Sequence, residues 1–173
     1  EKKNLPFYKF GDAIYLTKIE TKYWIEYICK RFENTGKHIS PELAEEICRL
    51  VDNHSSYVQQ LSWLLWIRTI NTATTEQLSY ALEDLLDQNN ILFQSETENL
   101  SAYQMNFLKA IVDGIHTKFS SKEVISKYNL GTSANIVRLK NALLQKELIE
   151  TNGKEIVLAD PVFGVWFKKE MLY

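Results

Sequence analysis

His54 is the residue whose type and surroundings most clearly suggest chemistry. It lies in the turn Asn53-His54-Ser55, between one helical pattern that begins at Pro41 and another that begins at Ser55 or Ser56. The backbone N–H groups at the start of a helix attract anions, and an imidazole can donate a hydrogen bond to a phosphate. The turn is therefore a candidate phosphate site, and the alternative is a partly exposed histidine that helps to cap a helix.

A second group of candidate residues belongs to the last third of the chain. Its members are polar or basic residues on two expected helices and a β-hairpin: Asn135, Arg138, Asn141, Lys122 and Lys154. Amide and guanidinium groups on the outward face of a helix can pair with base edges, and lysines can contact phosphates. Residues 101–173 hold only 10 basic against 7 acidic residues, however. Such a modest excess leaves both a DNA contact and a protein contact open.

Several other chemistries are excluded by the residues themselves. The sequence has no GxxxxGKS/T phosphate loop, and no apolar strand ends in a pair of acids that could hold magnesium. Cys29 and Cys48 lie at apolar helix positions without zinc-ligand spacing, which is typical of reduced core residues in a cytoplasmic protein. We therefore expect no catalytic residue, no metal ligand and no ATPase activity in this chain. We expect the tryptophans to be core residues: Trp24, Trp63, Trp66 and Trp166.

Helices must position the turn around His54. Apolar residues at three- and four-residue spacing predict four of them, which begin near Glu20, Pro41, Ser55 and Thr74. The second has Ser40 as its N-cap and a proline as its first residue. The third is apolar over so wide an arc that we expect it to be the central helix. Short connections between them predict a compact bundle. No apolar run is long enough to cross a membrane.

A polar, acidic stretch at residues 95–101 is the predicted boundary between two domains. After it, a capping box of Ser101 with Gln104 opens three further helices. Two short strands then flank Asn152-Gly153, and a last helix follows Asp160. Helices followed by a β-hairpin are the order of a winged helix-turn-helix. We therefore expect a mainly α protein, with a four-helix domain at residues 19–99 and a winged-helix domain at residues 100–173.

Seven stretches, in a fixed order along the chain, carry a family resemblance: residues 5–12, 14–16, 39–42, 53–61, 131–138, 143–150 and 160–167. They resemble the carboxyl-terminal half of prokaryotic AAA-like signal-transduction ATPases of the archaeal type. In that family a P-loop domain binds and hydrolyses ATP, and a helical lid and a winged helix follow it. The resemblance implies that residues 1–18 hold the last strand of a missing ATPase core, at Ala13–Leu16, and that residues 19–99 are the lid.

The resemblance also implies a role for the turn. In the family, a Gly-His-Pro turn places its histidine on the phosphates of the bound nucleotide. Asn53, His54 and Ser55 occupy the matching positions here, with the glycine and the proline replaced. ATP and magnesium are thus expected in the parent protein, held by the missing P-loop domain, and no cofactor is expected in this chain itself. The winged helix is expected to contact double-stranded DNA or a protein, and no membrane partner is expected.

Two other functions remain open at this point. The chain could be a winged-helix DNA-binding regulator, in which residues 1–99 form an effector or dimerisation region. It could also be a structural adaptor for protein interactions that has no nucleotide role. The parent reading frame distinguishes the adaptor from the ATPase fragment, because only the latter requires an upstream P-loop.

Overall fold

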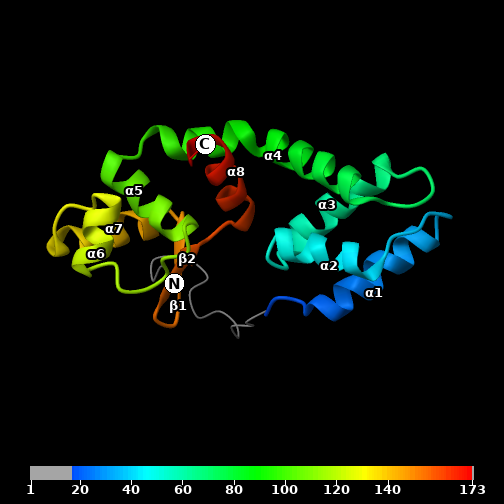
Figure 1. Cartoon of the computed structure of the whole chain (residues 1–173), viewed down its shortest axis with the longest axis horizontal. Helices are drawn as coiled ribbons and strands as arrows, with labels where there is room; N and C mark the ends of the chain where they lie inside the picture. The colour runs from blue at the N-terminus through cyan, green and yellow to red at the C-terminus, as the bar shows by residue number, and fades with distance from the viewer. Residues whose placement is uncertain (1–16, 173) are drawn as a thin grey trace, which may run out of the picture.

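A computed structural model describes residues 17–172, and the strand expected at Ala13–Leu16 lies outside the described residues. Over this range the chain is mainly helical and carries one small antiparallel sheet (Figure 1). In chain order the elements are α1 (Thr21–Glu33), α2 (Pro41–Leu50), α3 (Ser55–Arg68), α4 (Thr75–Glu98), α5 (Ala102–Val112), α6 (Lys122–Tyr128), α7 (Ser133–Gln145), β1 (Ile149–Asn152), β2 (Glu155–Leu158) and α8 (Pro161–Leu172).

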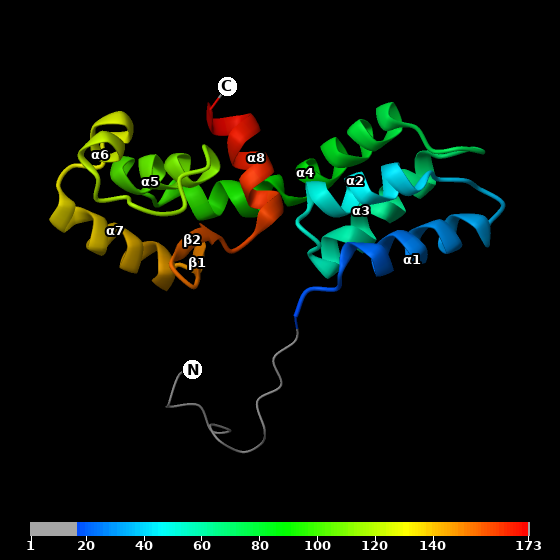
Figure 2. The same cartoon turned by 60° about the horizontal axis from the view of Figure 1, so that its bottom comes forward.

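Helices α1 to α3 and the first half of α4 form the first unit, seen at the right of Figure 2. The start of α2 confirms the predicted cap, because the Ser40 hydroxyl accepts a hydrogen bond from the backbone N–H of Leu43 at 3.2 Å. A parallel bridge ties the α1–α2 loop to the α3–α4 loop. In it the His38 N–H donates to the carbonyl of Asn71, and the Ala73 N–H donates to the carbonyl of His38.

Helix α3 differs from the expected central helix. Leu61 and Leu65 are fully buried, whereas 56% of Trp63 and 49% of Ile67 are exposed. The expectation that Trp63 is a core residue is therefore wrong. The physical reason is the packing around α3: it lies closely against α4, but it makes few contacts with α1, so one of its apolar faces stays open. Trp24 and Trp166 are buried as expected, and Trp66 is partly buried.

The second unit is a winged helix built from α5 to α8 and the β-hairpin. The predicted capping box is present, since the Ser101 side chain and the Gln104 side chain each bond the backbone N–H of the other residue. The two strands pair antiparallel with Asn152 opposite Glu155, so the predicted hairpin is confirmed. Gly153 has a positive φ of 61°, a conformation that a two-residue hairpin turn requires and that glycine adopts without strain.

A single helix, α4, runs through both units. Near its C-terminal end, Phe93 is 1% exposed and packs against Phe163 and Trp166 of α8, with ring centroids 5.5 and 5.6 Å away. The indole N–H of Trp166 also donates to Asn90 of α4 at 2.8 Å. The polar stretch at 95–101 does not end the helix before Glu98, and the buried Thr97 hydroxyl donates to the carbonyls of Phe93 and Gln94 one turn back.

Candidate functional site

The α2–α3 turn has a backbone conformation that most residues avoid. Asp52 and Asn53 both have positive φ, 48° and 53°. Asparagine and aspartate adopt this left-handed region more readily than other non-glycine residues, so Asn53 can replace the glycine expected there. Side-chain contacts also connect the turn to one residue just before α1 and to one residue within it. Lys18 pairs with Asp52 at 2.5 Å, and the side chains of Asn53 and Thr21 are within hydrogen-bond distance of each other at 3.0 Å.

His54 occupies the N-cap position of α3, but its side chain makes no capping hydrogen bond. Its ring packs on the ring of Tyr57, with centroids 4.7 Å apart and planes at 41°. The Nδ1 atom is buried and has no hydrogen-bond partner among the described residues. A buried polar atom without a partner costs free energy, so a movement of the ring that gave this nitrogen a partner would be favourable. The side chain is therefore not a helix cap.

Tyr57 connects the turn to the winged helix. Its hydroxyl donates to Asp160 Oδ2 at 2.6 Å, across 103 residues of sequence. Burial, together with the hydrogen bond to Asp160, raises the pKa of Tyr57 above its usual value, so the phenol remains a donor at neutral pH. The other carboxylate oxygen of Asp160 accepts from the N–H groups of Val162 and Phe163, at 2.8 and 3.0 Å. One carboxylate thus caps α8 and holds Tyr57.

Glu96, on the last turn of α4, completes the polar cluster at this contact between the two units. Burial raises the pKa of its carboxyl, and the nearby charge of Asp160 raises it further. The cluster therefore joins α3, α4 and α8 through Tyr57, Glu96 and Asp160. Sequence reasoning missed it. The sequence marks Asp160 as a helix start and as part of the resemblance at residues 160–167, and neither signal pairs it with a tyrosine so distant in the chain.

The candidate nucleic-acid contacts lie on three elements of the winged helix. Arg138 and Asn141 are exposed on α7, Lys122 is exposed at the start of α6, and Lys154 is exposed in the hairpin turn. Asn135 is less available than expected. Its amide donates to the Leu130 carbonyl at 2.9 Å and accepts from Arg138 at 2.9 Å, so both ends of the amide are used within the protein.

Two further observations bound the chemistry of the described residues. Both cysteines are free thiols. Burial is the main cause of a raised pKa at Cys29, and burial raises the pKa of Cys48 to about 11. Both thiols therefore stay protonated and unreactive at neutral pH. Between residues 17 and 172 there is no cluster of His, Cys, Asp or Glu that could hold a metal ion. Within the same range, no helix has the length and apolarity needed to span a bilayer.

Comparison with known proteins identifies the kind of domain in the second half of the chain. Residues 91–169 match the family described as "Probable winged helix domain", so the match begins inside α4 and ends within α8. The chain is thus a mainly helical protein with a winged-helix domain. A Walker-type ATPase of Pyrococcus abyssi has a similar structure, with a TM-score of 0.65 over 87% of this chain at 18% identity. This fold likeness covers 42% of the ATPase, so the chain spans less than half of that protein. No curated protein matches the sequence.

Proposed function

We propose that this chain is the lid and winged-helix part of an ATP-binding P-loop ATPase, and that it couples nucleotide state to a partner. The fold likeness to a Walker-type ATPase and the match to a winged-helix family support this general kind of function. The observation that carries the coupling role is the path from His54 through Tyr57 to Asp160. It leads by ring packing and one hydrogen bond from the candidate phosphate sensor to the cap of α8.

The nucleotide and its magnesium would be held by a P-loop domain outside this chain, because these residues include no phosphate cradle. The imidazole of His54 would donate to a phosphate oxygen after a movement of the ring that frees its Nδ1 from burial, and Asn53 and Ser55 shape the turn that presents it. If the His54 ring moved on gaining such a bond, the Tyr57 ring that packs against it would move as well, and the hydrogen bond from Tyr57 to Asp160 would change. We assign no catalytic residue to this chain, and the proposed place of action is the cytoplasm.

The test uses the full-length protein, whose reading frame must encode a GxxxxGKS/T motif upstream of these residues. His54→Ala should weaken binding of a non-hydrolysable ATP analogue about tenfold, because a hydrogen bond to a charged group is lost. Hydrogen exchange at the start of α8 should differ between the ATP-analogue and ADP states of the wild type. This difference should disappear in the variant. His38→Ala, which changes an exposed histidine of the same unit, serves as the control and should change neither quantity.

Two results would contradict the proposal. An upstream frame without a P-loop would favour the structural adaptor. A His54→Ala protein that keeps both its affinity and its exchange difference would remove the sensing role, even if the parent binds ATP.

DNA binding is a second candidate function, favoured by the exposed Arg138, Asn141, Lys122 and Lys154. The modest positive charge of the winged helix and the engaged amide of Asn135 argue instead for a protein partner. We therefore expect no measurable binding of a random-sequence DNA duplex in a fluorescence-anisotropy titration at about 50 mM salt. Measurable affinity that falls steeply by about 200 mM salt, and that Arg138→Ala weakens, would establish the DNA-binding function instead.

A further inference from the structure

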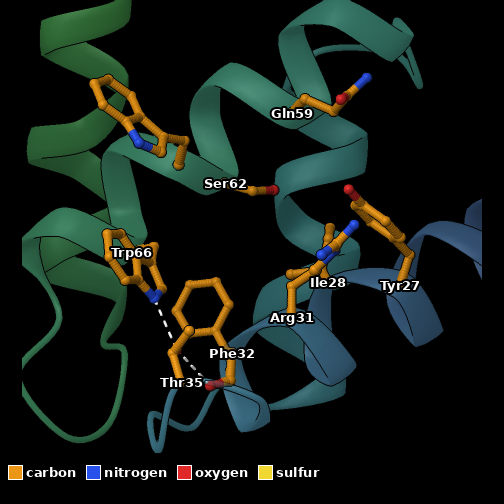
Figure 3. Close-up of a pocket in the computed structure, with 9 residues that line it drawn as sticks. Tyr27, Ile28, Arg31, Phe32, Thr35, Gln59, Ser62 and Trp66 are labelled. Carbon is orange, nitrogen blue, oxygen red and sulfur yellow. Dashed lines mark hydrogen bonds between the residues drawn. The ribbon is translucent and has the colours of Figure 1, made fainter.

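A groove lies between the C-terminal halves of α1 and α3 and is separate from the turn at Asn53–Ser55. Its lining comes from residues 27–35 and 59–66, and its volume is about 430 Å³ (Figure 3). This volume is within the range of small-molecule sites, which are mostly apolar with a few placed polar groups. The groove exists because α1 and α3 make few contacts with each other. The proposed nucleotide role uses none of its residues.

One wall of the groove is fixed before any ligand binds. The indole N–H of Trp66 donates to the Thr35 hydroxyl at 2.9 Å, and that hydroxyl donates to the Phe32 carbonyl at 2.8 Å; both bonds are drawn in Figure 3. The ammonium group of Lys37 lies 4.0 Å from the centroid of the Trp66 ring. The Trp66 ring is thus fixed by a hydrogen bond at its edge and by a cation 4.0 Å from its centre. A ring fixed in this way is a preorganised surface for stacking, and preorganisation lowers the entropic cost of binding.

Two polar groups of the lining lack the partners that such groups usually have. The Ser62 hydroxyl oxygen is buried without a hydrogen-bond partner among the described residues. In Figure 3 it points from α3 toward Tyr27 and Arg31 on α1. Arg31 carries the only charge in the lining, and no ion pair between residues 17 and 172 includes it. Its guanidinium lies instead 5.1 Å from the centroid of the Tyr27 ring.

The exposure of Trp63 points to the same place. More than half of this side chain is open to solvent, although it belongs to a helix that is apolar on most of its surface. An aromatic ligand in the groove would cover apolar surface that the chain leaves open, and burial of that surface is favourable.

We propose that this groove binds a small planar aromatic carboxylate. The aromatic part lies against Trp63 and Trp66, and the carboxylate pairs with the guanidinium of Arg31, whose planar donors match a carboxylate. The size of the groove favours a small molecule, and its single positive charge favours an anion.

The test measures binding of naphthaleneacetate and of its neutral amide to the 173-residue chain by calorimetry, with the indole N–H signals in ¹H–¹⁵N spectra as a second readout. The acid should bind at one site with a dissociation constant on the order of 0.1 to 1 mM, as is usual for a ligand of this size. The amide should bind about tenfold more weakly, because it lacks the charge-assisted bonds. Indole signals should shift in both titrations.

Variants assign the binding to the groove. Arg31→Gln should reduce the affinity for the acid to that for the amide and leave the amide unaffected. Trp63→Ala should weaken both ligands about fivefold or more. Tyr80→Ala is the matched control: it removes an aromatic side chain of the same unit that is also 56% exposed but does not line the groove, and it should change neither affinity.

Three outcomes would overturn the inference. One is the absence of saturable binding of either probe in the wild type. Another is binding that Arg31→Gln and Trp63→Ala leave unchanged. The third is self-association of the wild type in sedimentation velocity that Trp63→Ala abolishes, since the occupant would then be a second copy of the chain. The thermal unfolding of each variant must match the wild type, and an unstable Trp63→Ala protein is replaced by Trp63→Leu.

Discussion

Replacement of Asp160 by alanine should lower the free energy of unfolding by about 2 to 4 kcal/mol, an unusually large loss for a partly exposed residue. The substitution removes the hydrogen bonds from its carboxylate to the backbone of α8. It also leaves the buried Tyr57 hydroxyl without its acceptor. Urea unfolding followed by circular dichroism gives the loss, and the midpoint should shift at an unchanged slope if both forms unfold in one step.

Three comparisons separate the two contributions of Asp160. Asp160→Asn can keep the cap of α8 through its amide oxygen but places an NH2 group, which only donates, where Tyr57 finds its acceptor, so it should cost less than the alanine change. The Tyr57→Phe change, alone and combined with Asp160→Ala, isolates the interaction across the two units by a double-mutant cycle. Asp52→Asn is the matched control. It removes the charge of a 71% exposed side chain in a surface ion pair and keeps a residue type that tolerates the positive φ, so the loss should be small. Equal losses at Asp52 and Asp160 would contradict the structural role assigned to Asp160.

Phe93→Ala should lower the free energy of unfolding by about 3 to 5 kcal/mol. The side chain is 1% exposed and fills the space between α4 and α8 against Phe163 and Trp166. Its removal costs the transfer free energy of the ring and leaves a cavity. Thermal unfolding measures the effect, and the fluorescence of Trp166 should report the altered packing.

Ile91→Ala is the internal control for this prediction. Ile91 lies on the same helix only two residues earlier, but it is 82% exposed, so the change should stay within about 0.5 kcal/mol of the wild type. Similar losses at the two positions would show that the α4–α8 contact does not form the core described here.

The local signals were readable from the sequence because each depends on neighbouring residues. Ser40 with Pro41 marks a helix start, Ser101 with Gln104 forms a capping box, and Gly153 closes a hairpin. These signals, together with the helical periodicity, were enough for the four helices, the winged helix and their order.

Contacts between distant residues could not be read in this way. The bond between Tyr57 and Asp160 depends on how the two units meet, which no local pattern encodes. The apolar arc of α3 correctly predicted a helix but wrongly predicted that Trp63 is buried, because periodicity does not show whether another element covers a given face. The domain boundary at 95–101 stays a prediction. Phe93 nevertheless belongs to the winged-helix core although it precedes that boundary.

The unbroken course of α4 has a mechanical consequence. With 24 residues at 1.5 Å each, this helix is about 36 Å long. A rigid rod of that length converts an inclination of about 10° at one extremity into a sweep of roughly 6 Å at the other. Small rearrangements among the first three helices would thus be magnified geometrically at the far side of the molecule, without any joint along the way.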